Sequence, residues 1–238
     1  MTELRSCPNG LCVLSGGVGG AKLVLGLSQV LNNDDFMTIV NTGDDFVHLG
    51  LKICPDIDTI IYTLAELVDQ ERGWGLKDES WNFLEKTKLL GGESWFNLGD
   101  KDLATHVHRT QRLAKGEDLT SITKNLASSF GVEAKIVPMT NDLVSTVVET
   151  REGDLAFQHY FVRDRCLPIV KRFRFEGIKS SVINPSIKEY GEENNKSAVL
   201  LAPSNPFVSI DPIIGVPGMT EELVKMKGPK IAISPIIN

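Results

Sequence analysis

The sequence predicts an α/β protein with a Rossmann-like, mostly parallel sheet, a largely helical insertion and a β-hairpin. An apolar run at 11–14 leads into a glycine cluster, an amphipathic stretch and a second apolar run at 37–40. This strand–loop–helix–strand order opens a parallel α/β unit. Residues 198–202 are wholly apolar, as in strands buried on both faces of a sheet. We therefore expect a single domain over 1–238, with a helical insertion over 57–130.

The spacing of apolar residues predicts the individual helices and strands. Apolar residues at helical spacing predict helices at 21–31, 57–68, 78–90, 100–115, 119–130 and 221–227. Short apolar runs predict strands at 11–14, 37–40, 135–138, 198–202 and 231–233. Residues 144–150 and 155–162 alternate around Arg151-Glu-Gly-Asp154, which is typical of a hairpin. A covering helix usually follows a parallel strand, so the ending at 231–238 predicts a fragment or a naturally short chain.

Composition narrows the class of protein. With 238 residues, 42% of them apolar, the chain is long enough for one large domain. Its net charge of −6 argues against broad nucleic-acid binding. The four cysteines lack paired spacing, which argues against structural zinc or a disulfide framework. No signal pattern and no apolar run of roughly 20 residues is present, so we expect a soluble cytoplasmic protein with no membrane partner.

A run of aspartates follows the second predicted strand. Asp44 and Asp45 come directly after it, and Asp56 and Asp58 lie at the start of the next predicted helix. Ligands of open α/β sheets bind at the carboxyl ends of strands, and carboxylates suit a hard cation such as Mg²⁺. Alternatively, these aspartates cap a helix or form a turn.

A glycine-rich loop follows the first predicted strand and reads Ser15-Gly-Gly-Val-Gly-Gly-Ala-Lys22. Glycines let backbone N–H groups approach an anion at a helix N-terminus, so we expect phosphate contact there; a tight turn without a ligand is the alternative. The loop matches neither the Walker pattern nor the dinucleotide fingerprint. The expected phosphate-binding residues are Gly16, Gly17, Gly19, Gly20 and Lys22.

Two further segments carry candidate residues. His106 and Arg109 are three positions apart and so share a helix face, close to Asp100 and Lys101. Pro203-Ser-Asn-Pro206 follows the apolar strand at 198–202, where polar groups could contact a base or phosphate, or form a plain loop. Tryptophans 74, 81 and 95 are either core residues or stacking partners for a flat ring.

Taken in order, these motifs resemble the 2-phospho-L-lactate transferase family of deazaflavin coenzyme (coenzyme F420) biosynthesis. The resemblance covers nearly the whole chain, and its specificity lies in the ordered set. The matching motifs are Ser15-Gly-Gly-Val-Gly-Gly-Ala-Lys22, Asn41-Thr-Gly-Asp-Asp45, Cys54-Pro-Asp-Ile-Asp-Thr59, Arg72-Gly-Trp-Gly75, Leu98-Gly-Asp-Lys-Asp-Leu-Ala-Thr-His106, Pro138-Met-Thr-Asn-Asp142, Phe157-Gln158, Ala202-Pro-Ser-Asn-Pro206 and Ser234-Pro-Ile-Ile237.

The resemblance implies a Mg²⁺-assisted transfer. A ribityl hydroxyl of the deazaflavin Fo attacks a guanosine diphospho-linked acid of lactyl, enolpyruvyl or glyceryl type, and GMP leaves. Asp45 and Asp58 are expected as catalytic residues, and Asp44, Asp45 and Asp58 as metal ligands. Asp44 and Asp56 are otherwise expected as structural neighbours of that pair. The remaining expected substrate-binding residues are Asp100, Lys101, His106, Arg109, Ser204 and Asn205.

The resemblance also implies a homodimer and a longer chain, because family members continue past the Ser-Pro-Ile-Ile motif. A piece of the acceptor or nucleotide pocket would then be missing. Two alternatives stay open at this point. One is a non-enzymatic relative of the same superfamily that binds nucleotide sugars and acts in regulation. The other is an NAD(P)-dependent oxidoreductase, against which the imperfect glycine fingerprint and Lys22 count.

Overall fold

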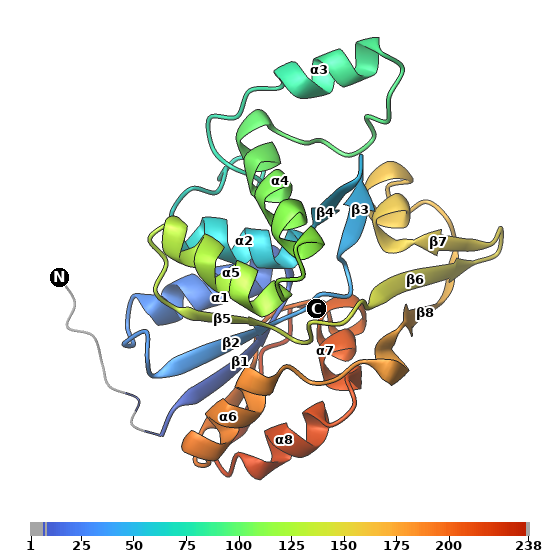
Figure 1. Cartoon of the computed structure of the whole chain (residues 1–238). Coiled ribbons are helices and arrows are strands. Elements are labelled where there is room, and N and C mark those ends of the chain that lie inside the picture. The colour runs from blue at the N-terminus through green and yellow to red at the C-terminus, as the bar shows by residue number, and fades with distance from the viewer. Residues whose placement is uncertain (1–6, 8, 237–238) are drawn as a thin grey trace.

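The computed structural model describes residues 7 and 9–236 (Figure 1). Those residues form a five-stranded parallel sheet in the order β10-β9-β1-β2-β5, which confirms the predicted fold class. The strands are β1 (Leu11–Ser15), β2 (Phe36–Val40), β5 (Lys135–Pro138), β9 (Ala198–Leu201) and β10 (Lys230–Ala232). The chain moves outward from β1 first to β2 and β5 and then, in the other direction, to β9 and β10. The strand order therefore reverses between β1 and β9, and such a switch point is where Rossmann-like folds bind ligands.

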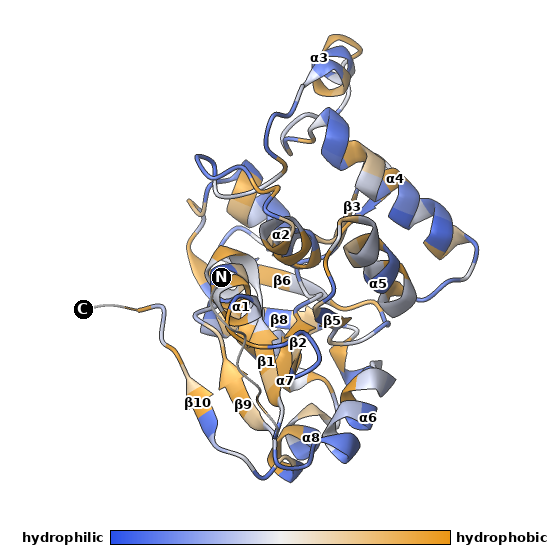
Figure 2. Cartoon of the chain, turned by 90° about the vertical axis from the view of Figure 1, so that its left-hand side faces the viewer, coloured by the Kyte–Doolittle hydropathy of each residue, from blue (hydrophilic) through white to orange (hydrophobic). Residues whose placement is uncertain are grey.

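Helices cover both faces of this sheet (Figure 1). On one face lie α1 (Gly17–Ser28), α2 (Pro55–Leu64) and α5 (Leu119–Ser129); on the other lie α6 (Pro185–Glu193), α7 (Asp211–Gly215) and α8 (Met219–Lys225). Alternation along β1 supplies both cores, because Val13 packs with the first layer while Cys12 and Leu14 pack with the second. The central strands are accordingly hydrophobic along their length (Figure 2).

The range 57–130 spans two environments. Within it, α2 and α5 pack on the sheet through residues such as Ile57 and Ile122. By contrast, α4 (Asp100–Ala114) lies against α5 and the short strand β4, and α3 (Asn82–Leu89) is the helix farthest from the sheet in Figure 1. β4 (Leu51–Ile53) pairs with β3 (Phe46–His48) in an antiparallel ribbon that the sequence did not predict. This ribbon positions the start of α2 beside α4.

A second sheet of described residues contains β6 (Ser145–Thr150), β7 (Asp154–Ala156) and β8 (Val170–Glu176) in the order β7-β6-β8. The predicted hairpin is confirmed, but the strand predicted over 155–162 is wrong, since β7 ends at Ala156 and a π-helical turn occupies His159–Arg163. Successive strand residues face opposite sides. Here Phe157 and Gln158 are both buried and both face the same cavity, which requires the chain to leave the strand.

Other boundaries differ locally. α1 begins at Gly17, four residues before the predicted start, because the glycine cluster forms its first turn. α6 was missed although the Asn184 side chain caps it and Pro185 opens it, both of which are helix-start signals. β8 and α7 were also missed. Ile237 of the Ser-Pro-Ile-Ile motif lies outside the described residues. Among the helices described here, none has the length and apolar character to cross a membrane.

Candidate functional site

A cavity of about 670 Å³ opens at the carboxyl ends of β1, β2 and β9, beside the switch point. Segments far apart in sequence line it: the glycine loop, the start of α2, one face of α4, the turn after β7 and the loop after β9. Its lining includes Gly16, Gly17, Gly19, Asp44, Asp56, Asp58, Tyr62, Arg72, Trp74, Phe96, Asp102, His106, Phe157, Gln158, Phe161, Ser204, Asn205 and Ser209.

The glycine loop is held against the loop that follows β9. The Gly16 N–H donates to Ser204 Oγ at 3.0 Å, and that hydroxyl donates to the Gly16 carbonyl at 2.8 Å. A Cβ on Gly19 would lie 2.4 Å from the Pro203 carbonyl oxygen, so only glycine permits this approach. Gly17 has a φ of 65° and donates its N–H to Asp56 Oδ1 at 2.7 Å. The glycines therefore let the loop after β1 pack against the loop after β9 and against the start of α2, at the switch point of the sheet.

The structure places the other loop residues differently. Gly20 is buried, and a Cβ there would meet the side chains of Ser15 and Ser204. Lys22 is exposed on α1 and is not part of the cavity lining. Asn205 lines the cavity, and its side chain also accepts from the Phe207 and Val208 N–H groups to open the following turn.

The four aspartates divide in a way the spacing did not predict. Asp44, Asp56 and Asp58 line the cavity, whereas Asp45 is turned toward the β3–β4 ribbon. Asp45 Oδ2 lies 3.3 Å from Lys52 Nζ and accepts from Cys54 Sγ at 3.0 Å. Asp56 accepts from Gly17 and, through Oδ2, from Asn41 Nδ2 at 2.9 Å. Within residues 7 and 9–236, Asp44 Oδ1 and Asp58 Oδ2 are buried without a hydrogen-bond partner.

Burial makes these carboxylates costly to ionise. Burial raises the pKa of Asp44 well above its usual range, and the neighbouring Asp56 adds to this. Burial raises the pKa of Asp56 to about 6, although the bonds from Asn41 and Gly17 oppose it. Burial also raises the pKa of Asp58, against the opposing charge of Arg109. The cavity therefore favours a proton or a cation beside these oxygens.

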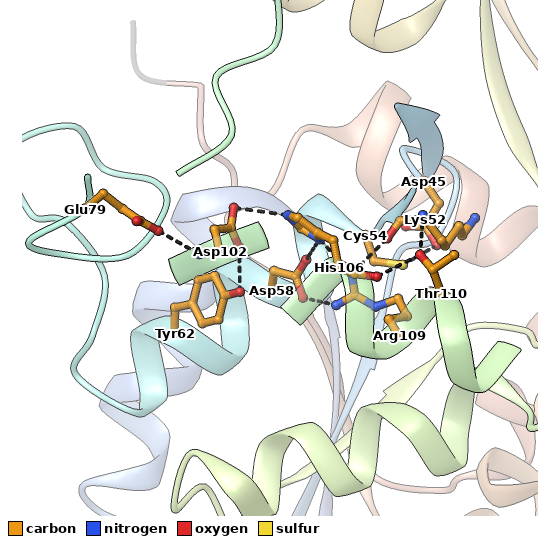
Figure 3. Close-up of polar contacts among 10 residues, drawn as sticks. All are labelled: Asp45, Lys52, Cys54, Asp58, Tyr62, Glu79, Asp102, His106, Arg109 and Thr110. Atoms are coloured by element: carbon orange, nitrogen blue, oxygen red, sulfur yellow. Dashed lines mark hydrogen bonds and ion pairs between the residues drawn. The ribbon is translucent and has the colours of Figure 1, made fainter. Parts of the chain in front are cut away.

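One face of α4 lies against α2 (Figure 3). Tyr62 OH donates to Asp102 Oδ1 at 2.6 Å, and Asp102 Oδ2 lies 3.1 Å from His106 Nε2. Arg109, which is fully buried, contacts Asp58 Oδ1 through NH2. Burial alone would lower the pKa of Arg109, but the Asp58 carboxylate outweighs burial and raises it, so the guanidinium stays charged. The predicted shared face of His106 and Arg109 is confirmed, with Nδ1 and NH1 3.2 Å apart.

Asp100 and Lys101 lie outside the cavity lining. The Asp100 carboxylate accepts from the Asn82 and Phe83 N–H groups and from Ser80 Oγ, and so caps α3. These hydrogen bonds, with that of Ser80 the strongest, lower the pKa of Asp100. Lys101 Nζ donates to the Lys77 carbonyl at 3.1 Å. Both side chains therefore tie the 77–83 segment to the start of α4.

Aromatic rings form part of the cavity lining. Trp74 and Phe96 line the cavity together with Phe157 and Phe161, whose rings stack at 5.5 Å and 12°. Trp81 instead lies under the Arg72 guanidinium, 4.7 Å away. Sequence reasoning missed Phe161 and the roles of Tyr62 and Asp102. The sequence did carry a signal for Tyr62 and Asp102. Tyr62 follows Asp58 by four residues, and Asp102 precedes His106 by four, so each pair shares a helix face.

The carboxylates of the cavity lining fit a hard cation whose ligands come partly from the protein and partly from substrate. Among the described residues no three His, Cys, Asp or Glu side chains are grouped as a metal site, so Asp44, Asp45 and Asp58 do not form a triad. Mg²⁺ is commonly held by one or two carboxylates together with substrate phosphates and water. Asp44 and Asp58, each with a buried oxygen that lacks a partner in the described chain, match that donor set. Magnesium itself stays a prediction.

The fold and the cavity define an α/β protein with a cavity at the switch point of a Rossmann-like sheet. Comparison with known proteins places it more narrowly. A model of the family described as 2-phospho-L-lactate transferase CofD matches residues 11–238, and the chain belongs to this family of transferases.

Relatives in this family come from archaea and bacteria. The chain is 39% identical over 227 residues to a 2-phospho-L-lactate transferase of Methanosarcina mazei, which covers 95% of this chain and 74% of the relative. It is 38% identical over 233 residues to a phosphoenolpyruvate transferase of Streptomyces coelicolor, which covers 95% of this chain and 72% of the relative. These two relatives carry different names for the group they transfer.

Solved structures share the fold at low identity. A protein from Bacillus halodurans superposes with a TM-score of 0.65 at 16% identity, over 94% of this chain and 68% of that one. A second structure of the same Bacillus halodurans protein, described as a member of the UPF0052 family, gives a TM-score of 0.62 at 15% identity, over 98% of this chain and 69% of that one. This likeness supports the architecture alone.

Proposed function

We propose that this protein transfers a phospho-acid group from a guanosine diphospho-linked donor to the ribityl hydroxyl of the deazaflavin Fo, in coenzyme F420 biosynthesis. The acid would be 2-phospholactate, phosphoenolpyruvate or a related three-carbon group. The hydroxyl oxygen forms a new bond to the phosphorus that carries the acid, the bond from that phosphorus to the bridging oxygen breaks, and GMP leaves with that oxygen. The hydroxyl proton passes to a base or to solvent.

The observation that carries this proposal is a pair of carboxylates, Asp44 and Asp58, that line one cavity and each have a buried oxygen without a partner among the described residues. Phosphoryl transfer depends chiefly on positioning and on charge stabilisation at the phosphorus. The glycine loop with Ser204 and Asn205 would form the donor side of the site. The aromatic lining residues Trp74, Phe96 and Phe161 suit a flat, ring-bearing acceptor.

We assign the cavity-facing roles to Asp44 and Asp58, in place of the expected pair Asp45 and Asp58. Asp45 is outside the cavity lining and is paired with Lys52 and Cys54. Asp44 and Asp58 would hold Mg²⁺, which would offset phosphate charge when bound. Asp58 would also orient the attacking hydroxyl. A homodimer stays a prediction of the family resemblance, and a cytoplasmic location stays a prediction from the composition and the N-terminal sequence.

The test is binding followed by transfer. Calorimetry with GDP and with Fo, each with and without Mg²⁺, should show saturable binding of both, with GDP tighter when Mg²⁺ is present. A guanosine diphospho-acid and Fo should then yield GMP and the phosphodiester product. Binding of a UDP-sugar with none of Fo would instead favour a nucleotide-sugar-binding regulator.

The matched variants are Asp58→Asn and Asp34→Asn. Asp58→Asn removes a charged oxygen at the cavity and should lower turnover by about 100-fold or more while the protein stays folded. Asp34, whose side chain is exposed near Lys135, should tolerate the same change. Wild-type turnover in Asp58→Asn would overturn the assigned role of Asp58.

A further inference from the structure

Two helix faces form a buried polar ladder beside the cavity (Figure 3). α2 contributes Asp58 and Tyr62, one turn apart, and α4 contributes Asp102, His106 and Arg109 over two turns. Tyr62, His106 and Arg109 are at most 2% exposed. Tyr62 pairs with Asp102 at one end and Arg109 with Asp58 at the other, and His106 lies between them. Most donors in a buried cluster meet an acceptor, and among the described residues Arg109 Nε and His106 Nε2 are the members of this ladder whose nitrogen lacks one.

Hydrogen-bond direction along the ladder is determined by Arg109. A guanidinium can only donate, and its NH1 lies 3.2 Å from His106 Nδ1 and 3.3 Å from the Lys52 carbonyl oxygen. His106 Nδ1 must therefore accept, which leaves the imidazole proton on Nε2. Nε2 in turn lies 3.1 Å from Asp102 Oδ2, within ion-pair distance but without the geometry of a hydrogen bond. In the opposite tautomer His106 Nδ1 would carry a proton, and this donor would face another donor, Arg109 NH1.

This arrangement determines how Asp58 meets the cavity. Its Oδ1 is held by Arg109 NH2. Its Oδ2 lies 3.7 Å from His106 Nδ1, which carries a lone pair in this tautomer and has no proton to give. Oδ2 therefore stays free of a partner among the described residues, on a side chain that lines the cavity. Arg109 itself lies outside that lining.

We propose that Arg109 and Asp102 are positioning residues: Arg109 fixes one oxygen of Asp58 and, together with the nearby Asp102, sets the His106 tautomer that leaves the other Asp58 oxygen without a partner, on a side chain that lines the cavity. The proposal rests on the proposed transfer for its kinetic consequence. Arg109 then acts through Asp58 and not by contact with substrate, unlike the expectation from the sequence. The planar fork of arginine matters here, because it reaches Asp58, His106 and the Lys52 carbonyl together.

The kinetic test compares Arg109→Lys with Arg112→Lys. Lysine keeps the charge at 109 but loses the fork, so Asp58 should shift and kcat should fall by about 100-fold, with KM for each substrate within about threefold. Arg112 lies one turn further along α4 and pairs with Glu117 near the surface, so Arg112→Lys should keep wild-type kcat. Added guanidinium should restore part of the kcat of Arg109→Ala. Wild-type kcat in Arg109→Lys, or a loss explained by weaker GDP binding, would overturn the proposal.

A second readout does not depend on activity. The chain has four histidines, so ¹⁵N NMR of the labelled wild-type protein can assign the His106 ring. We expect a proton on Nε2 and a bare Nδ1. Asp102→Asn replaces the charged group beside Nε2 with a neutral amide and should lower the share of the Nε2–H tautomer, while Arg109 NH1 still opposes a proton on Nδ1. Nδ1 protonation in the wild type overturns the positioning role even if transfer occurs, whereas absence of transfer with the expected spectrum overturns only the proposed function.

Discussion

Asp56 and Asp58 lie two residues apart on α2, and both are 5% exposed, yet the protein holds them by different means. Both oxygens of Asp56 accept from neutral donors, Gly17 N–H and Asn41 Nδ2. Asp58 has one oxygen on a buried guanidinium and the other without a partner in the described chain. The comparison teaches that Asp56 joins the glycine loop to the residue after β2, whereas Asp58 is held through one oxygen only.

The largest effect should come from removing the charge that holds Asp58. Arg109→Ala leaves a buried carboxylate without its cation, which costs about 3–5 kcal/mol of unfolding free energy. The double variant Arg109→Ala/Asp58→Asn should recover part of that loss, because the stranded charge is gone. Urea unfolding measures both, with Arg112→Ala as the control on the same helix. Equal losses in Arg109→Ala and Arg112→Ala would show that the Asp58 charge does not depend on Arg109.

The next effect concerns Asp56 and depends on pH. Its pKa is about 6 in the folded protein against an ordinary 3.8, so the folded state binds the proton more tightly than the unfolded state. The resulting stability is complete below pH 3.8 and is lost as the pH rises to about 6. A difference of about 2 units corresponds to about 3 kcal/mol.

Asp56→Asn removes this titration. The unfolding free energy of the variant relative to wild type should therefore rise by about 3 kcal/mol between acid and neutral pH. Urea unfolding at several pH values from 4 to 7 measures the trend, with Asp34→Asn as a surface control. A constant difference across this range would mean that neutral donors stabilise the charged form of Asp56 as well as water does.

The smallest effect concerns the glycine loop, to which Asp56 is bonded. Gly19→Ala forces a Cβ against the Pro203 carbonyl oxygen and should cost about 1–3 kcal/mol of unfolding free energy. Gly26 lies in the same helix with open space around its Cβ position, so Gly26→Ala should stabilise the protein by about 0.5–1 kcal/mol. Urea unfolding of both variants gives the signs. A stabilising Gly19→Ala would show that the two loops can separate at little cost.

Much of the sheet could be predicted from the sequence because buried parallel strands are continuous apolar runs. β1, β2, β5 and β9 lie within a residue of their predicted positions. β3 and β4 could not be predicted this way, since each has three residues and is defined by pairing with the other. β8 did carry a signal, with Val170, Phe173 and Phe175 interleaved with charged residues, but charge obscured it.

The candidate site was predictable in position and less so in its residues. Glycines after β1 and aspartates after β2 marked the correct edge of the sheet. Asp44 and Asp45 are adjacent, so spacing alone could not tell which one faces the cavity. The ribbon of β3 and β4 decides it, because Lys52 and Cys54 bind Asp45 and leave Asp44 on the lining.

The sequence by itself determined the Rossmann-like class, the family motifs and the helical spacing that puts His106 and Arg109 on one face. These depend on periodicity and local order, which are written in consecutive residues. Only the tertiary structure decided that Asp44 faces the cavity, that Asp100 caps α3, and that α4 lies against α2 so that Arg109 reaches Asp58. Those outcomes depend on contacts between different elements of the fold, such as Cys54 with Asp45 and Arg109 with Asp58, whose geometry is set by packing and by the need to pair buried charge.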